Sequence, residues 1–190
     1  MKISRVGQAT PLNPLTYQEI SNHFVTETHK LFLGLAWYTG ERPEAILRID
    51  VTHVYENPAR REPRDTVIYP GLNRKDRQTR EVPTYWALKL MLAAYQPPET
   101  GFLFPSLYKS GQHLSRQAID KAFRRAVKKA GLQQKGFSLY SARRGFITRL
   151  NEQGRDIKTI QSLTGHKSLS SLIQYIDVSD EQRKNAIANF

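Results

Sequence analysis

The chain has 190 residues and no cysteine, which excludes a disulfide scaffold and any thiolate metal site. Its 29 lysines and arginines outnumber 17 acidic residues, and the resulting net charge of +12 favours a polyanion such as nucleic acid as partner. The longest apolar stretch, Leu31 to Tyr38, is far too short to cross a bilayer, so no membrane association is expected.

The first helix is predicted to follow a short irregular segment. Residues 1–14 contain two prolines and show little periodicity, so we interpret them as a linker or tail. Thr16 and Glu19 have the spacing of a capping box, with the apolar Leu15 just before the cap. This pattern predicts a helix that starts at Thr16 and runs to about residue 28.

A buried helix is predicted next. It begins near His29 and is apolar nearly all round, which is typical of a helix inside the core. Gly40 is suited to end it, because glycine readily adopts the left-handed conformation of a C-terminal cap. Pro43 is suited to the first turn of another short helix, which extends through Leu47.

The middle of the chain changes to β-branched and aromatic residues. Val51–Tyr55, Thr66–Tyr69 and Arg80–Pro83 are predicted to be strands. Helical periodicity then returns, and Ser115 and Ser179 are predicted to cap two of the helices. The expected fold is therefore mainly α with a small three-stranded antiparallel β-sheet (α+β), and its later helices are expected over residues 85–95, 115–130, 141–153, 156–163, 168–175 and from 179 onward.

Short motifs follow one another in a fixed order along the chain. They are Thr39–Ala45 (TGERPEA), Lys75 eight residues before Pro83, Gly101–Ser106 (GFLFPS), Gly131-Leu132, Leu139–Phe146 (LYSARRGF), Leu163–His166 (LTGH), and Tyr175 nine residues after His166. The ordered set resembles the tyrosine recombinases of the phage integrase family, over roughly residue 16 to the C-terminus. The resemblance implies the catalytic-domain fold of that family at residues 15–190. It also implies that the N-terminal core-binding domain, which clamps DNA, is absent, either trimmed away or naturally missing.

Arg42 and Arg143 stand in the two boxes where the family has its arginines. A guanidinium fork can hold two non-bridging oxygens of a phosphodiester and keeps its proton. Two arginines can therefore supply the transition-state stabilisation that other nucleases obtain from Mg²⁺. The resemblance accordingly implies no metal, no ATP and no other cofactor. Taken alone, either arginine would more simply be read as one partner of a surface or structural ion pair.

The resemblance assigns roles to three further residues. Tyr175 is the expected nucleophile, although the chain has nine tyrosines and any one of them is more often a core or surface residue. His166 resembles the histidine that hydrogen-bonds the phosphate, with a helix cap as the alternative interpretation. Lys75 resembles the general acid that protonates the departing 5′ oxygen, with a simple phosphate contact as the alternative.

Two positions depart from the family pattern. Tyr140 stands where the second box usually starts with histidine, three residues before Arg143. A neutral phenol donates a hydrogen bond but is a poor general base near neutral pH. We therefore expect Tyr140 to fill the same position by hydrogen bonding, with a reduced rate of catalysis. Arg144 also stands where histidine is common. Both changes bear on the catalytic rate and not on the fold.

Further DNA contacts are expected from basic residues around the site. Arg74 and Arg77 flank Lys75, and Arg144 follows Arg143. On the helix after Ser115, basic side chains oppose the apolar face, and the family lays the corresponding helix in the major groove. A solvated basic face is the alternative for each of these helix residues, which are Lys121, Arg124, Arg125, Lys128 and Lys129.

The expected activity is site-specific recombination through a 3′-phosphotyrosine intermediate on double-stranded DNA. The resemblance implies a tetramer on DNA, assembled through the C-terminal segment Ser179–Phe190, and a monomer when free. The expected location is the cytoplasm, on the nucleoid when the protein is bound to DNA.

Three alternatives remain open at this point. A type IB topoisomerase-like enzyme would share the chemistry, a non-catalytic DNA-binding protein would retain the fold, and a basic module would bind another polyanion.

Overall fold

A long buried helix forms the centre of the molecule in the computed structural model, which describes residues 8–74, 76–176, 183–184 and 187–188. This helix, α2 (Glu27–Thr39), buries eight of its residues, because apolar side chains surround it on nearly all sides. Five helices pack on it: α1 (Pro14–Asn22), α3 (Pro43–Leu47), α4 (Trp86–Ala94), α5 (Arg116–Lys129) and α6 (Ser141–Glu152). The expectation of a mainly α fold is confirmed.

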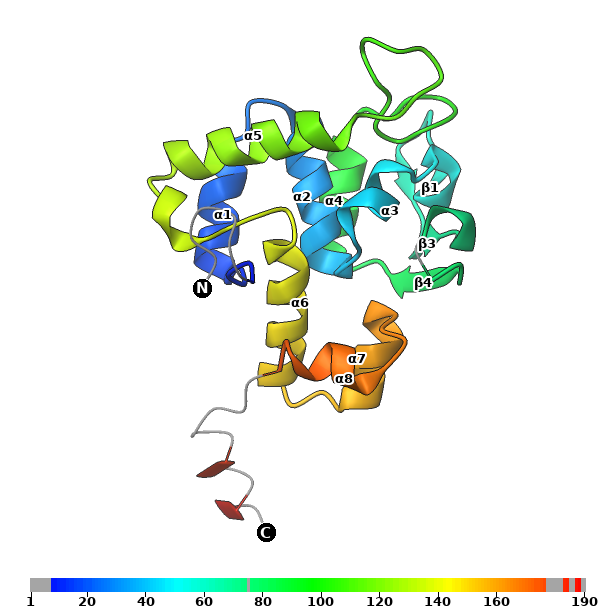
Figure 1. Ribbon diagram of the computed structural model, residues 1–190. Coiled ribbons are helices and arrows are strands. Elements are labelled where there is room, and N and C mark those ends of the chain that lie inside the picture. The colour runs from blue at the N-terminus through cyan, green and yellow to red at the C-terminus, as the bar shows by residue number, and fades with distance from the viewer. Residues whose placement is uncertain (1–7, 75, 177–182, 185–186, 189–190) are drawn as a thin grey trace.

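Figure 1 shows how these elements are arranged. Helix α5 lies across α1 and α2, and α6 runs from the level of α1 down to two short helices, α7 (Ile157–Thr164) and α8 (Leu169–Ile173). The strands lie on the far side of α2 from α1. Among the described residues, no helix combines the length and the apolar character needed to cross a membrane.

The start of α1 differs from the expectation. Asn13 is the cap, not Thr16: Asn13 Oδ1 accepts a hydrogen bond from the Thr16 backbone N–H at 2.9 Å, and Thr16 Oγ1 accepts one from the Asn13 N–H at 3.0 Å. The residue before it, Leu12, is 2% exposed and bonds through its N–H to the Ser141 carbonyl at 3.0 Å. The last residues of the expected tail therefore belong to the packed fold. Helix α1 also ends earlier than expected, and α2 starts anew behind its own cap, Thr26.

The expected three-stranded sheet is wrong in detail. Residues Val51–His53 form a 3-10 turn (η1), because Asp50 Oδ1 caps the Thr52 N–H at 3.0 Å. In the described residues, β1 (Tyr55–Asn57) pairs with β2 (Glu62–Pro63), and β3 (Thr66–Tyr69) pairs separately with β4 (Arg80–Pro83). Both pairs are antiparallel. The connection between β3 and β4 includes the 3-10 turn η2 (Gly71–Asn73).

The later helices follow the expectations closely. Ser115 caps α5 by accepting the Ala118 N–H at 3.1 Å, and Asp156 and Ser168 cap α7 and α8. Helices α6, α7 and α8 share a small apolar cluster of their own, centred on Ile147, Ile160 and Leu172. A further 3-10 turn, η3 (Gln133–Lys135), lies between α5 and α6. The helix expected from Ser179 lies outside the described residues except for residues 183–184 and 187–188.

Candidate active site

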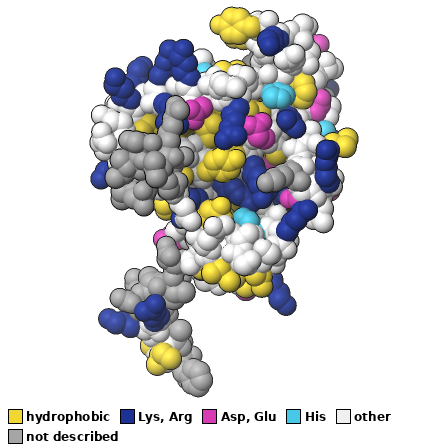
Figure 2. Space-filling model, in the orientation of Figure 1, with side chains coloured by type: hydrophobic (Ala, Val, Ile, Leu, Met, Phe, Trp, Pro, Cys, Tyr) yellow, Lys and Arg dark blue, Asp and Glu magenta, His cyan; other side chains and the backbone are white. Residues whose placement is uncertain are grey.

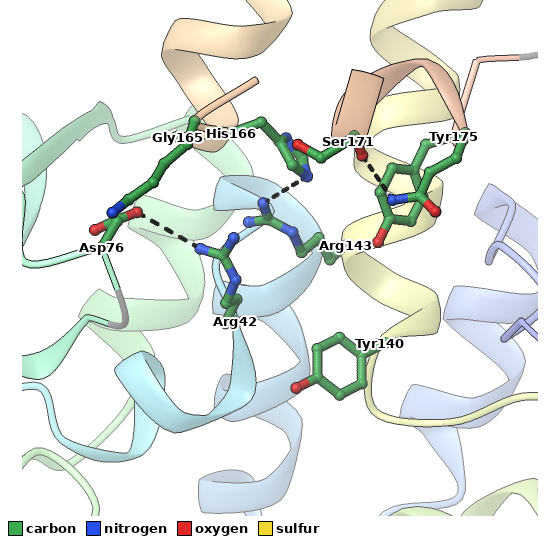
Figure 3. Close-up of a pocket in the computed structure, with 10 residues that line it drawn as sticks. Arg42, Asp76, Tyr140, Arg143, Gly165, His166, Ser171 and Tyr175 are labelled. Carbon is green, nitrogen blue, oxygen red and sulfur yellow. Dashed lines mark hydrogen bonds and ion pairs between the residues drawn. The ribbon is translucent and has the colours of Figure 1, made fainter. Parts of the chain in front are cut away.

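One open cavity of about 360 Å³ gathers side chains from four separate parts of the chain. They come from the start of α3, the β3–β4 connection, the start of α6, and the segment from the end of α7 through α8. Figure 3 shows the labelled side chains converging on this space. Its lining consists of Arg42, Asp76, Tyr140, Arg143, Gly165, His166, Lys167, Ser171, Gln174 and Tyr175.

Arg42 reaches the cavity because α2 ends sharply. Gly40 has φ of +63°, and a β-carbon there would overlap the ring of Phe146 on α6, so only glycine lets the two helices approach this closely. Arg42 then caps α3 in an extended conformation. Its Nη1 is buried, yet it has no hydrogen-bond acceptor among the described residues. An unsatisfied buried donor costs about 1–3 kcal/mol, so this atom is poised to take an acceptor from a ligand.

Glu41 is the centre of the charge network and is fully buried. Its Oε2 lies 2.9 Å from Arg80 Nη2 and 3.3 Å from Arg74 Nε. Its Oε1 lies 3.9 Å from Arg143 Nη1 and 4.0 Å from Arg42 Nη1. One carboxylate therefore lies within 4.0 Å of four guanidinium groups. Without its negative charge, the buried guanidinium groups would repel one another and lack a counter-ion.

Arg143 is held rigidly at the floor of the cavity. Its Nη1 donates to the Gly40 carbonyl at 2.6 Å, and its Nη2 donates to the Thr164 carbonyl at 2.9 Å. Burial, followed by the charge of Arg42, lowers the pKa of Arg143 to about 9, so its guanidinium stays protonated at neutral pH.

His166 is oriented by bonds at both ring nitrogens. Nε2 lies 3.2 Å from Arg143 Nη2, and Nδ1 lies 2.7 Å from Thr164 Oγ1, which itself donates to the Ile160 carbonyl at 2.7 Å. Because arginine can only donate, Nε2 accepts, and the ring proton is assigned to Nδ1. Burial, followed by the charge of Arg143, lowers the pKa of His166 to about 3. The imidazole is therefore neutral over the physiological pH range.

Tyr175 lies just after α8, at the edge of the apolar cluster formed with α6 and α7. Its ring centroid is 5.5 Å from that of His166, and the Arg144 guanidinium lies 5.1 Å from the ring centre on another side. The phenol therefore lies near both an imidazole and a cation, and it lines the cavity that contains Arg42 and Arg143. Arg144, the residue after Arg143, lies against this ring and donates from Nη1 to Gln8 Oε1.

Tyr140 immediately precedes α6 and lines the same cavity, with 37% of its surface exposed. The guanidinium of Arg116, the first residue of α5, lies 5.6 Å from the centre of its ring. Arg116 in turn pairs with Glu44 at 3.4 Å. The phenol is thus presented to the cavity from the junction of three helices.

The other expected site residues differ in where they lie and in how exposed they are. Lys75 lies outside the described residues. Arg74 is 5% exposed and paired inside the charge network, so its guanidinium is not presented at the surface. Arg77 is exposed, with φ of +61°. The basic face of α5 is open to solvent, and Figure 2 shows lysine and arginine side chains gathered over that helix; the five residues concerned are Lys121, Arg124, Arg125, Lys128 and Lys129.

Sequence reasoning missed four members of the network: Glu41, Asp76, Arg80 and Thr164. The available signal was position, because Glu41 and Asp76 are acids directly beside Arg42 and Lys75 in a chain with a large basic excess. Arg80 could have been found from the alternation of β4, where it occupies a buried position. Its Nη1 donates to the Leu163 carbonyl, which ties the strand to α7.

Comparison with known proteins identifies similar chains. Residues 15–182 match the family model described as "Phage integrase family". An 81-residue stretch is 33% identical to tyrosine recombinase XerD of Brucella suis biovar 1 (strain 1330), covering 43% of this chain and 26% of that protein. The matched part therefore spans about a quarter of that relative's length.

Solved structures share the fold. The Tn1549 transposon integrase in complex with a circular intermediate DNA superposes with a TM-score of 0.75 at 16% identity, covering 97% of this chain and 67% of that chain. The integrase from mycobacterium phage Brujita gives a TM-score of 0.66 at 26% identity, covering 95% and 57%.

Proposed function

Because the chain belongs to the phage integrase family of tyrosine recombinases, we propose that it breaks and rejoins DNA strands at specific sites through a 3′-phosphotyrosine. The observation that carries this proposal is the convergence of Arg42, Arg143, His166 and Tyr175, which come from three separate segments, on one cavity. In this proposal Tyr140 and Lys75 complete the catalytic set.

The charge of the network suits a phosphoryl transition state. Four guanidinium groups, those of Arg42, Arg74, Arg80 and Arg143, face two carboxylates, those of Glu41 and Asp76, so two positive charges are left uncompensated. A phosphodiester carries one negative charge, and its pentacoordinate transition state carries about two. The network therefore matches the transition state better than the ground state, which is the condition for catalysis.

In the cleavage step, the Tyr175 oxygen bonds to phosphorus and the bond from phosphorus to the 5′ oxygen breaks. The phenol proton is released to the bulk solvent, because His166, with a pKa of about 3, stays neutral near physiological pH and does not retain it. Arg42 Nη1 takes a non-bridging oxygen, the charge of the fixed Arg143 guanidinium stabilises the developing negative charge, and Lys75 protonates the departing 5′ oxygen. Attack by a 5′-hydroxyl of the partner duplex reverses these steps and releases Tyr175.

The proposal includes independence from metal ions and ATP, because the arginines supply the positive charge and the phosphotyrosine retains the energy of the broken bond. The partner is double-stranded DNA, contacted by Arg77 and the basic face of α5. We further propose a tetramer on DNA, a monomer when free, and a cytoplasmic, nucleoid-associated location.

A library of nicked duplexes with random sequence around the nick tests the proposal. Cleavage near the nick lets a short 5′-hydroxyl fragment diffuse away, so the covalent complex accumulates and survives a denaturing gel. The proposal expects adducts in EDTA without ATP, and sequencing of the attached DNA gives the site. The absence of any adduct, or adducts that form only when Mg²⁺ is added, would contradict the proposal. Joining of strands from two labelled duplexes then separates recombination from supercoil relaxation.

A further inference from the structure

Two segments of the chain each carry one acidic and one basic residue, and the acid of each segment pairs with the base of the other. Glu41 and Arg42 are consecutive at the α2–α3 junction, and Arg74 and Asp76 lie in the connection between β3 and β4. Arg74 Nε is 3.3 Å from Glu41 Oε2, and Asp76 Oδ2 is 3.8 Å from Arg42 Nη1. Figure 3 shows the second of these contacts inside the cavity. The pairing is reciprocal: each segment contributes one acid and one base.

Three of the four side chains in this arrangement are buried. The exposed fractions are 2% for Arg74, 6% for Asp76 and none for Glu41, whereas the Arg42 side chain is 28% exposed. Arg74 and Asp76 also bind each other at 2.9 Å. Salt in the solvent screens such buried charges much less than it screens surface pairs.

Arg74 is fixed further by backbone contacts on two sides. Its Nη1 donates to the Gln78 carbonyl at 3.1 Å, within its own connection. Its Nη2 lies so near Gly165, where φ is +66°, that a β-carbon there would overlap it. Gly165 immediately precedes His166. One guanidinium therefore touches the connection itself, the α2–α3 junction and the turn between α7 and α8.

We propose that these pairs form a latch, defined as Glu41–Arg74 together with Arg42–Asp76, which docks the β3–β4 connection on the active site. Lys75 stands between the two latch residues in the sequence. Arg74 and Asp76 are then positioning residues for proton transfer to the departing 5′ oxygen, and Arg74 is not a DNA contact. The latch rests on the proposed function, because it presupposes that Lys75 is the acid of that reaction.

The leaving group offers a test that general damage to the fold does not mimic. When the 5′-bridging oxygen of the scissile phosphate is replaced by sulfur, the product is a thiol, whose pKa is near 8.5, and it departs without being protonated. A defect in proton delivery is therefore rescued by sulfur, whereas a defect in holding the phosphate is not. The ratio of the sulfur and oxygen rates, measured on one sample, is independent of the fraction of folded protein.

The experiment measures single-turnover adduct formation by the full chain on nicked duplexes that carry the selected site with either atom. Arg74→Lys keeps the charge but loses the fork, and Asp76→Asn removes the partner of Arg42. Each should slow the oxygen substrate by about 10²-fold, the lower end of the usual contribution of an acid, and the sulfur substrate by less than about 3-fold. Lys75→Ala gives the reference ratio.

Matched controls make the same substitutions in exposed ion pairs away from the site. Arg64→Lys alters the pair with Glu56, and Asp65→Asn alters the pair with Lys89. Both controls should keep the parent ratio. Equal slowing of both substrates by Arg74→Lys and Asp76→Asn, or no slowing of either, would overturn the latch. A parent chain that forms no adduct on either substrate would instead remove the proposed function, and the latch with it.

Discussion

Replacement of Glu41 by glutamine should destabilise the protein strongly, because this carboxylate balances the arginine network. Four guanidinium nitrogens lie between 2.9 and 4.0 Å from its two oxygens, and the side chain has no exposed surface. Glutamine keeps the shape and removes the charge. Breaking a buried ion pair by removing one partner costs about 3–5 kcal/mol, since the remaining charge stays buried.

The loss is large compared with the stability of an ordinary domain, about 5–15 kcal/mol. For a domain of this size each kcal/mol corresponds to about 2–4 °C in Tm, so Glu41→Gln should lower the Tm by about 6–20 °C. Thermal unfolding followed by circular dichroism measures this shift. Glu56→Gln is the control, because Glu56 forms an exposed pair with Arg64 whose loss costs less than about 1 kcal/mol.

Equal and small shifts for the two variants would refute the reasoning, because they would mean that the arginines disperse or stay solvated without Glu41. The same Tm measurements at raised salt concentration provide a second test. The destabilisation by Glu41→Gln should persist at high salt, whereas any effect of Glu56→Gln should shrink.

Three further predictions concern catalysis, protonation and DNA affinity. Tyr140→His should raise the cleavage rate near neutral pH by less than about 10²-fold, because the phenol already offers a hydrogen bond, and Tyr140→Phe should be slower than the parent; if adduct kinetics show that both changes are silent, Tyr140 is a packing residue. The His166 imidazole should show no titration by NMR above about pH 4, since its folded pKa is about 3 and the ordinary pKa of histidine is 6.5. Between these pH values the folded state then binds fewer protons than the unfolded state, so His166 lowers the stability of the protein as the pH falls from 6.5 towards 3. A ring that titrates near pH 6.5 in the folded protein would contradict the neutral state assigned to His166. DNA affinity should fall with salt with a slope of about −0.9 per neutralised phosphate, and Lys128→Ala should reduce that slope by about 1; an unchanged slope would show that Lys128 contacts no phosphate.

Local signals in the sequence predict most helices well, because their caps are encoded within a few residues. Ser115, Asp156, Ser168 and Gly40 all end or begin a helix where the pattern indicates. The predicted start of α1 was wrong because both Asn13 and Thr16 can act as a cap. Asn13 is the cap because the fixed φ of the following Pro14 suits the first helical turn, and because Thr16 Oγ1 accepts a hydrogen bond from the Asn13 N–H.

The segment 51–55 was misassigned for a similar reason. Its β-branched residues favour a strand, but Asp50 caps a 3-10 turn at Val51–His53, and pairing begins only at Tyr55. The shortened strand pairs with β2 and not with β3. Local propensity could not reveal the turn, because the side chain of one preceding residue caps it.

The candidate site was predictable where the motifs carry it and not elsewhere. Arg42, Tyr140, Arg143, His166 and Tyr175 line one cavity. The buried acids that organise them leave no periodic trace in the sequence, since an ion pair such as Glu41–Arg74 depends on the tertiary fold. The burial of Arg74 in this network was unpredictable for the same reason, because charge alone does not distinguish a surface arginine from a buried one.

Covalent attachment of Tyr175 to DNA can be observed by peptide mapping of the trapped adduct with mass spectrometry. After nuclease digestion, we expect a nucleotide-modified peptide that contains Tyr175. The Tyr175→Phe variant should form no adduct although it still binds the DNA. Modification of another of the nine tyrosines, or an adduct that survives in Tyr175→Phe, would contradict the account.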